Sequence, residues 1–430
     1  MVKARIDYVP EAACGALPQT SLSRAMNLGI SQSSLHPLHR LWQWLPAGPR
    51  RRLLARGTAL LARRPDFPAP AARGGVAVVG EFSRASGLGE AARIMRRAID
   101  CIGLPTWAID LDAPAAIELP PGVPLLLHVN APLLPLALLR APRGLVRGRR
   151  VIGYWAWELP TVPDTWRAGL SFVHEIWALS SFTADAFRAW LPPDAVQPVR
   201  TVPIPLAVAP PAPAALDRAA FGLPGDAVVV LVSCNLASSL ERKNPLGAIA
   251  AFKQAFGDRP DRVLLLKLAN PEHHPADFAT VREAVAGAAN IRIDTRTLPA
   301  ADSHALTACA DLVLSLHRSE GFGLVPAEGM LLGRAVIATG WSGNMDFMNA
   351  DSAALVGYRL VPARDPRGVF EAPGAVWAEP DIAEAAAHLA RLADDPAGRA
   401  ALAERGRRMA QRCLGDAPLR QALRGIGLPA

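Results

Sequence analysis

Short apolar segments alternate with helical segments along two stretches of the chain. In the first stretch, segments typical of buried strands lie at residues 76–80, 106–109, 125–129, 151–155 and 175–179. Segments with helical spacing of apolar residues lie among them, at residues 87–101, 164–170 and 181–191. Strands that are apolar on both faces are typical of parallel sheets covered by helices. The first stretch therefore predicts a doubly wound α/β domain.

The second stretch repeats this pattern after a segment rich in proline and alanine. Its strand candidates lie at residues 227–232, 262–268, 291–294, 311–316 and 335–338, and the chain becomes helical and rich in alanine from residue 381. We therefore expect two Rossmann-like parallel-sheet domains, at 75–205 and 221–390, that face each other across a cleft. The rest of the chain is predicted to form a basic N-terminal extension at 1–74, a linker at 206–220 and C-terminal helices at 391–430.

A glycine turn follows the strand at 311–316 and opens a helix. Gly321 and Gly323 place no side chains in the turn, and Pro326 fits the first helical position. Backbone N–H groups at such a helix N-terminus bind phosphate. Two carboxylates, Glu320 and Glu328, bracket the turn. Because carboxylates repel phosphate, we expect them to accept hydrogen bonds from the hydroxyls of a sugar and a ribose.

The turn resembles the donor-site signature of family 4 glycosyltransferases of the GT-B fold. The matching residues are Glu320 and Glu328, in a Glu-Gly-Phe-Gly-Leu setting, followed by a small-residue helix and a Val-Ile-Ala-Thr strand. The resemblance spans roughly residues 75–390. It implies that Glu320 contacts the transferred sugar and Glu328 the nucleotide ribose. The residues implied to surround the donor between them are Gly321, Phe322, Gly323 and Leu324. The alternative is an ordinary βα unit with exposed acids.

Basic residues follow the strands of the second domain. Arg242 and Lys243 lie together at the entry to a helix, where they could neutralise a diphosphate whose negative charge grows as the glycosyl bond breaks. In the family, an Arg precedes the Lys by a few residues, so only Lys243 falls on the expected position. Lys267, at the end of the next strand, is a further candidate phosphate partner.

A loop of small residues follows the strand at 335–338. Ser342, Gly343 and Asn344 take the place of the Gly-Gly loop of the family, with Ser342 in the position of the first glycine. Small side chains permit a close approach to a donor. A plain turn between strand and helix is the alternative.

The first domain has a glycine loop of its own at Gly87 and Gly89. It resembles the loop of GT-B enzymes that lies over the donor diphosphate or near the acceptor. With Ala92 and Asp110, it also imitates a dinucleotide fingerprint, which makes an NAD-dependent oxidoreductase the alternative class. Six residues separate Gly80, at the strand end, from Gly87, whereas the fingerprint places its first glycine at the strand end.

Aromatic and polar residues end two strands of the first domain. Trp155, Trp157 and Glu158 could stack on a sugar ring and accept hydrogen bonds from its hydroxyls. The family often has a His at this place, which is absent here. His128 and Asn130, after the preceding strand, are candidates to line the cleft, although a lone His near a core strand is more often structural.

Metal and disulfide sites are not expected. The five cysteines are odd in number and share no Cys-x-x-Cys spacing, which favours a reducing cytoplasm. Asp110 and Asp112 imitate the Asp-x-Asp motif of metal-dependent glycosyltransferases, but those enzymes lack the Glu-x7-Glu turn. By resemblance the reaction needs no metal and no cofactor, with the nucleotide sugar as co-substrate.

The net charge of +8 is concentrated near the N-terminus. Residues 1–75 hold 11 Lys and Arg against 3 Asp and Glu, and 11 − 3 = +8, the net charge of the whole chain. Pro49 could start a basic helix with Leu53, Leu54, Gly57, Leu60 and Leu61 on one face. Together with an apolar patch that starts at Leu38 and contains two tryptophans, residues 38–64 predict either a membrane-surface anchor or an extension folded back on the domains. No nucleic-acid-binding motif accompanies the charge.

These patterns together favour one function over two others. We expect a cytoplasmic glycosyltransferase that assembles a polysaccharide or surface glycan, either free in the cytoplasm or peripheral on the cytoplasmic membrane face. By resemblance it retains anomeric configuration. No secretion signal is visible, and the apolar window at 123–139 is too short and too interrupted to span a bilayer. The alternatives are the oxidoreductase and a sugar-nucleotide-binding module without catalysis.

Overall fold

The first of two parallel sheets is built from the N-terminal half of the chain. The structure is a computed structural model that describes residues 53, 57–84, 86–113, 118–142, 144–370 and 372–430. The sheet has the strand order β2-β1-β3-β4-β5-β6, and every pair in it is parallel. Its strands are β1 (Val76–Gly80), β2 (Thr106–Asp110), β3 (Leu125–Leu127), β4 (Val151–Trp155), β5 (Glu175–Ala178) and β6 (Val199–Thr201). The strand β6 was not expected from the sequence.

The second sheet has the order β12-β11-β10-β7-β8-β9 and is also parallel throughout. Its strands are β7 (Val228–Asn235), β8 (Arg262–Ala269), β9 (Ile291–Asp294), β10 (Leu312–Ser315), β11 (Ala335–Thr339) and β12 (Ala354–Val356). Between β6 and β7 the chain forms only the short helix η3 (Ala219–Phe221). The prediction of two doubly wound parallel-sheet domains is confirmed.

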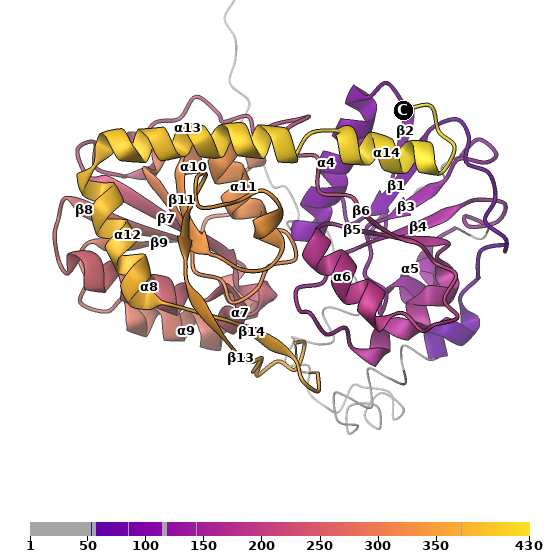
Figure 1. Cartoon of the computed structure of the whole chain (residues 1–430), viewed down its shortest axis with the longest axis horizontal. Coiled ribbons are helices and arrows are strands. Elements are labelled where there is room, and N and C mark those ends of the chain that lie inside the picture. The colour runs from indigo at the N-terminus through magenta and orange to yellow at the C-terminus, as the bar shows by residue number, and fades with distance from the viewer. Residues whose placement is uncertain (1–52, 54–56, 85, 114–117, 143, 371) are drawn as a thin grey trace, which may run out of the picture. The chain divides into compact units, whose positions relative to one another are not determined.

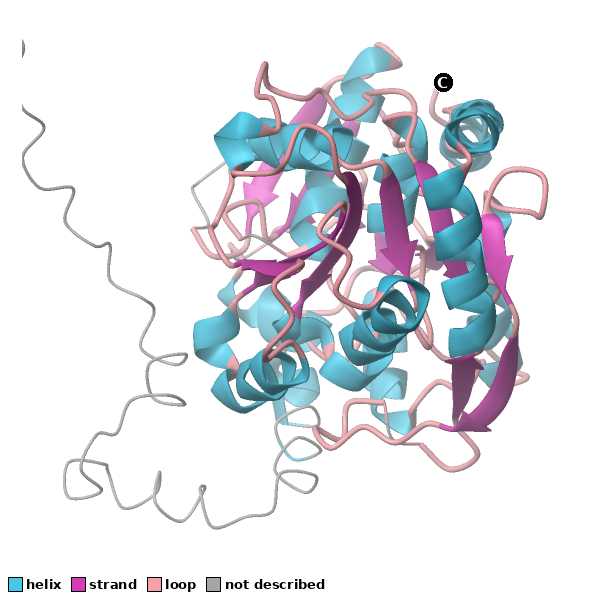
Figure 2. Ribbon diagram, turned by 90° about the vertical axis from the view of Figure 1, so that its left-hand side faces the viewer, coloured by secondary structure: helices cyan, strands magenta, loops and turns pink. Residues whose placement is uncertain are grey.

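Helices connect the strands and cover the sheets, as Figure 2 shows. Those of the first domain are α4 (Gly87–Cys101), α5 (Leu134–Arg140), η2 (Asp164–Phe172) and α6 (Ser181–Trp190). Those of the second are η4 (Leu236–Ser238), α7 (Leu240–Lys243), α8 (Pro245–Phe256), η5 (Pro271–His273), α9 (Pro275–Ala284), α10 (Ala300–Cys309), α11 (Leu324–Leu331) and η6 (Gly343–Asp346). Among the described residues, no helix is long and apolar enough to cross a bilayer.

The C-terminal helices return to the first domain. They are α12 (Ile382–Asp394), α13 (Pro396–Cys413) and α14 (Ala417–Gly425), drawn in yellow in Figure 1. The Ala207 N–H donates to the Leu414 carbonyl at 2.9 Å, which ties the end of α13 to the chain that leaves β6. In α14, a Cβ atom at Gly425 would lie 3.0 Å from the guanidinium of Arg200, which belongs to β6. Helix α14 therefore lies against the Arg200 side chain of the first sheet.

A β-hairpin interrupts the alternation of strands and helices in the second domain and was not expected. It consists of β13 (Tyr358–Pro362) and β14 (Val376–Pro380), which pair antiparallel and form a sheet of their own. Arg318, which precedes the glycine turn, holds the hairpin: its guanidinium lies 2.6 Å from the Glu379 carboxylate, and its carbonyl accepts the Ala378 N–H at 2.9 Å. The hairpin is therefore fixed to the segment that carries Glu320.

Residues 57–74, which we assigned to the N-terminal extension, pack on the first domain. The Asp66 carboxylate accepts the Gly148 N–H at 2.7 Å, and the Asp66 carbonyl lies 2.9 Å from His174 Nε2. The Arg150 side chain donates to the Pro70 carbonyl at 3.2 Å. This part of the extension therefore folds back on the domain, as one of the two interpretations expects. The apolar patch upstream of residue 49, with Leu54, lies outside the described residues.

Candidate functional site

The glycine turn between β10 and α11 depends on close backbone approaches. Gly323 has a positive φ of 97°, which favours glycine, and it caps the start of α11. A Cβ atom at Gly343 would lie 2.1 Å from the Gly321 carbonyl oxygen, so the η6 loop reaches the turn only because residue 343 has no side chain. The Ser342 hydroxyl accepts the Glu320 N–H at 2.9 Å. Of the residues expected near the donor, Gly321, Gly323, Ser342 and Gly343 are therefore brought together.

Glu320 is buried beside two cations. Its carboxylate lies 2.5 Å from the Lys243 ammonium and 3.2 Å from the Arg242 guanidinium. Burial raises the pKa of Glu320, but the nearby charges of Lys243 and Arg242 outweigh burial and lower it to about 2. The carboxylate is therefore ionised at neutral pH, and the site has two cations within reach of it.

Arg242 and Lys243 come from a helix of one turn. Ser239 begins α7 with a positive φ of 86°, and Asn244, with a φ of 50°, ends it and starts α8. The Arg242 side chain donates to the Ser319 carbonyl at 2.8 Å, and the Arg318 N–H donates to the Arg242 carbonyl at 2.7 Å. This short helix is therefore locked to the segment before Glu320.

The first domain contributes Glu158 to the same cluster. The Glu158 carboxylate lies 3.8 Å from the Arg242 guanidinium. Burial raises the pKa of Glu158, which Glu320 also raises and Arg242 and Lys243 oppose. The Ser319 hydroxyl donates to the Glu158 carbonyl, and the Ser180 hydroxyl donates to the Gly321 carbonyl at 2.6 Å. Two carboxylates and two cations thus gather where the domains meet, as expected for Glu158 from the sequence.

Glu328 lies in different surroundings from Glu320. Its half-buried carboxylate lies 3.9 Å from His304 Nε2, on α10. Burial raises the pKa of Glu328 to about 8, and the charge of Glu90 on α4 adds to this effect. The two glutamates of the signature therefore prefer opposite protonation states in the unliganded protein. A hydroxyl pair, such as that of a ribose, could replace the proton on Glu328 by donating hydrogen bonds to it.

The raised pKa of Glu328 predicts a pH-dependent effect of Glu328→Gln on stability. A carboxyl whose pKa is about 8 in the folded state stabilises the protein fully below the pKa of the unfolded chain, and this stabilisation is lost as the pH rises through 8. From pH 5 to pH 8.5, the free energy of unfolding of the variant should therefore rise relative to wild type, by on the order of 2 kcal/mol. Urea unfolding of wild type and Glu328→Gln at both pH values tests this, with the exposed Glu283→Gln as control. A difference in the free energy of unfolding between Glu328→Gln and wild type that is the same at pH 5 and pH 8.5 would contradict it.

Three of the expected site residues are buried in the core instead. Trp155 is fully buried and Trp157 is 4% exposed, and both rings pack edge-on against Trp166. Phe322 is 4% exposed and packs on Phe347. The expectation that the two tryptophans stack on a sugar is wrong for this conformation, because neither ring has a free face. Phe322 likewise supports the turn from inside.

His128 and Asn130 also serve the core of the first domain. His128 is 1% exposed, its ring stacks 4.5 Å from the Tyr154 ring, and burial lowers its pKa to about 3. The expectation that His128 lines the cleft is therefore wrong. The Asn130 side chain accepts the Ala156 N–H at 2.9 Å, which shapes the segment that leads to Glu158. Asn130 thus helps to position Glu158 through its hydrogen bond to the Ala156 backbone.

The other candidate residues are divided between the turn and local structure. The buried Asn344 donates to the Thr339 carbonyl at 3.1 Å, and Leu324 packs on the core, so both shape the turn. The Lys267 ammonium donates to the Arg296 carbonyl at 2.5 Å and faces Asp294 at 3.8 Å. It therefore already has partners on the β9 side, which does not support its expected role toward a phosphate.

The glycine loop of the first domain is closed by its own side chains. At Gly89 a Cβ atom would lie 2.5 Å from the Glu81 carbonyl oxygen, whereas Gly87 has open space. The Arg84 guanidinium lies 2.9 Å from Glu81 and 2.7 Å from Asp112, and the Ser83 hydroxyl donates to Asp110. The acid that would bind a ribose in a dinucleotide site is therefore occupied. Within the described ranges, no cluster of three or more His, Cys, Asp or Glu could hold a metal ion.

Several residues of the cluster were missed in the sequence. Arg318, Ser319 and Ser180 fix the turn, and the fully buried His317 lies beside it, with its pKa lowered by burial to about 4. Only their position at the carboxyl ends of β10 and β5 could have indicated them.

Several solved structures match this chain over most of its length. HepE of Anabaena, in complex with UDP and glucose, matches with a TM-score of 0.55 at 13% identity, over 81% of this chain and 98% of that chain. Sucrose-phosphate synthase of Thermosynechococcus elongatus matches with a TM-score of 0.57 at 17% identity, over 82% of this chain and 98% of that chain. WaaG, a glycosyltransferase involved in lipopolysaccharide biosynthesis, matches with a TM-score of 0.52 at 15% identity, over 82% of this chain and 100% of that chain. The chain therefore has the GT-B fold.

Sequence comparisons add no closer relative. No protein-family model matches the chain, and no curated protein sequence matches it.

Proposed function

We propose that the protein transfers a sugar from a nucleotide-diphosphate sugar to a hydroxyl group of a glycan or glycolipid acceptor. The observation that supports this most is the pairing of Glu320 with Arg242 and Lys243, beside the glycine turn that begins α11. The cations can stabilise the charge that develops on the diphosphate as it leaves, and Glu320 can accept hydrogen bonds from the sugar. HepE, which has the same fold, was solved with UDP and glucose.

Three finer features belong to this proposal and rest mainly on the resemblance to family 4. They are retention of the anomeric configuration, independence of a metal ion, and a setting in polysaccharide or surface-glycan biosynthesis. Two cations at the turn support the second feature, because they supply the positive charge that a divalent ion supplies in other sites. WaaG, a protein of the same fold, acts in lipopolysaccharide biosynthesis, which supports the third.

The NAD-dependent alternative has weaker support. The Ser83 hydroxyl and Arg84 occupy the acids at the end of β2, where a dinucleotide ribose would bind. The third candidate, a binding module without catalysis, would need the same nucleotide but would release no sugar.

Calorimetric binding of UDP, GDP, ADP and NAD, without added metal, tests the proposal. We expect one nucleotide diphosphate to bind and Glu328→Ala to weaken it by about tenfold, because a carboxylate that accepts from a ribose contributes roughly 1.5–3 kcal/mol. The exposed Glu283→Ala, on α9, is the control. Binding of NAD alone, or of no nucleotide, would overturn the donor site; binding without release of sugar from the matching nucleotide sugar would favour the binding module.

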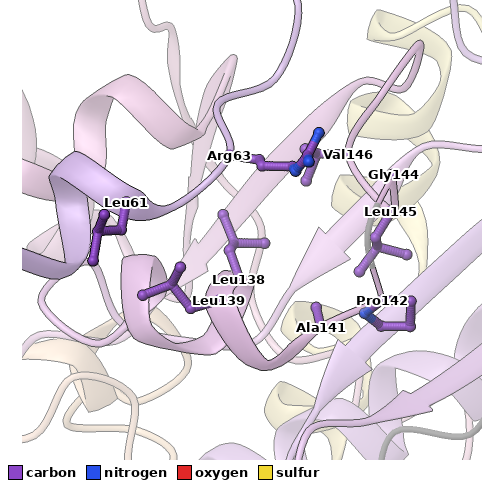
Figure 3. A pocket seen from close by; sticks show the side chains of 9 residues that line it. All are labelled: Leu61, Arg63, Leu138, Leu139, Ala141, Pro142, Gly144, Leu145 and Val146. Carbon is purple, nitrogen blue, oxygen red and sulfur yellow. The ribbon is translucent and has the colours of Figure 1, made fainter.

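We further propose that the first domain docks on an anionic membrane surface that carries the acceptor. Leu60 and Leu61, in the helical turn at 57–61, are 82% and 75% exposed. Leu61 lies beside Leu138 and Leu139 of α5, with Arg63 close by, around a cavity of about 300 Å³ (Figure 3). Exposed leucines flanked by arginines are typical of helices that bind the membrane interface. The charge of residues 1–75 adds to the attraction.

Cosedimentation with phosphatidylglycerol vesicles tests this docking. We expect the Leu60→Ser, Leu61→Ser double variant to reduce vesicle binding by about tenfold, because each leucine side chain buried in lipid contributes roughly 1 kcal/mol or more. Val196→Ser, at a position that is 75% exposed elsewhere on the first domain, should leave binding unchanged. Equal binding by wild type and the double variant would exclude these leucines from the contact.

A further inference from the structure

A loop that no pattern in the sequence singled out closes one side of the candidate site. Residues 363–370, here called the strap, follow β13 of the hairpin labelled in Figure 1. Asp365, 1% exposed, accepts the N–H groups of Val369 at 2.9 Å and Phe370 at 3.2 Å. The Ser239 hydroxyl, at the start of α7, lies 3.3 Å from the same carboxylate. The strap is therefore a closed turn attached to the helix that carries Arg242 and Lys243.

A second attachment holds the strap to the second domain. The Arg367 guanidinium forms an ion pair with Asp277 on α9 and donates to the Leu236 carbonyl at 2.7 Å. With Asp365 and Arg367 both engaged, the conformation of the strap is fixed from two sides.

The strap also reaches the first domain through Phe370. This ring is 5% exposed and lies 5.6 Å from the Trp157 ring. The Arg242 guanidinium lies over the Phe370 ring, 5.2 Å from its centroid. A cation over an aromatic face is attracted to it, so Phe370 helps to hold Arg242 in place.

A cavity of about 120 Å³ lies between the strap and the two domains. Its lining includes Glu158 from the first domain, Ser238, Ser239 and Arg242 from the second, and Arg367 and Phe370 from the strap. At roughly 30 Å³ for each water molecule, the volume corresponds to about four waters. This is room for at least a hydroxymethyl group and a neighbouring hydroxyl.

The cavity offers a hydroxyl group both a hydrogen-bond acceptor and a hydrogen-bond donor. The Glu158 carboxylate can accept from an O–H group. The Arg242 guanidinium also lines the cavity and can donate to a hydroxyl oxygen. The Glu158 carboxylate in the lining repels anions, so a neutral hydroxylated group fits this cavity better than a phosphate.

We propose that this cavity binds the hydroxyl-bearing end of the acceptor, and that the strap determines which acceptors fit. The proposal rests on the proposed glycosyltransferase function and adds the place and the chemistry of the acceptor subsite. Arg242 connects that subsite with Glu320, which places an acceptor hydroxyl next to the sugar of a bound donor.

Saturation-transfer NMR with methyl α-glucoside, methyl α-galactoside and glycerol, in the presence of saturating nucleotide diphosphate, tests the subsite. We expect at least one of these probes to bind wild type, and Glu158→Gln and the strap variant Phe370→Leu to weaken that binding by about tenfold, the loss expected for one hydrogen bond to a charged group or one disturbed wall. The controls are Glu283→Gln and Phe278→Leu, both on α9, which should bind as wild type.

The outcomes separate this subsite from the donor site. If the nucleotide binds wild type but no probe does, or if both variants bind the probes normally, the subsite is wrong while the proposed function stands. If inorganic phosphate displaces the probes and Glu158→Gln strengthens phosphate binding, the cavity is an anion site and the inference is also overturned. If no nucleotide diphosphate binds at all, the proposed function itself has failed.

Discussion

Replacing Lys243 with methionine is expected to lower the rate of sugar transfer by about a hundredfold or more. The Lys243 ammonium lies 2.5 Å from Glu320, on the short helix α7, so it can face the diphosphate of a donor held at the turn. Removing one preorganised group that stabilises developing negative charge costs roughly 3 kcal/mol of barrier. Methionine keeps most of the length of the lysine stem, which limits the effect to the charge.

The measurement is the initial rate of nucleotide release from the nucleotide sugar whose base the binding experiment identifies. Lys253→Met on α8 is the matched control, since the Lys253 ammonium donates only to the Ala284 carbonyl at an exposed site. A Lys243→Met enzyme that keeps a rate near wild type would remove Lys243 from the stabilisation of the leaving group.

Arg242→Leu is expected to lower the free energy of unfolding by about 3–5 kcal/mol. Arg242 is 3% exposed. Its guanidinium forms an ion pair with the Glu320 carboxylate, donates to the Ser319 carbonyl and lies over the Phe370 ring. Without it, the buried Glu320 and the partly exposed Glu158 keep Lys243 as a nearby cation. The cost comes mainly from the uncompensated carboxylates, because a buried charge that loses its partner cannot regain water.

Urea unfolding of a double-mutant cycle measures this cost. Arg242→Leu with Glu320→Leu should cost less than the sum of the two single variants, because the double variant leaves no orphaned partner of the pair. Additive costs would show that the pair is not coupled. Arg96→Leu, at a half-exposed ion pair with Asp100 on α4, should change stability by less than about 1 kcal/mol.

The same cycle has a pH dependence with a defined sign. The pKa of Glu320 is lowered to about 2 from an ordinary value of 4.5, so Glu320 contributes stability above pH 4.5 that is lost as the pH falls toward 2. In Arg242→Leu the pKa of Glu320 should rise, which shrinks this contribution.

The alternation of strands and helices was sufficient to predict both sheets, because parallel strands that are covered on both faces are apolar throughout. It missed β6 and β12, which are three residues long and lie at sheet edges, where few apolar residues are required. It also missed the hairpin β13–β14, whose first strand is largely exposed and carries no core pattern.

The site was predicted where its chemistry is local in the sequence. Glu320 and its glycines form one continuous motif, and Arg242 with Lys243 follow a strand that lies next to β10 in the sheet. The tryptophans were misplaced because the sequence shows which residues end a strand but not which face of the strand each side chain takes in the final packing. The strap could not be predicted, since the contacts that attach it to the second domain join residues 90 or more positions apart.

The hydrogen bond between Ala207 and Leu414 joins the two places where the chain passes from one domain to the other. Because the two crossings lie side by side, a rotation of one domain against the other about this place would strain neither connection. Such a rotation must break the contacts from Ser180 to Gly321 and from Ser319 to Glu158. Entry of a donor and release of the spent nucleotide would then share one motion, resisted by these hydroxyl contacts and by the packing of Phe370 on Trp157.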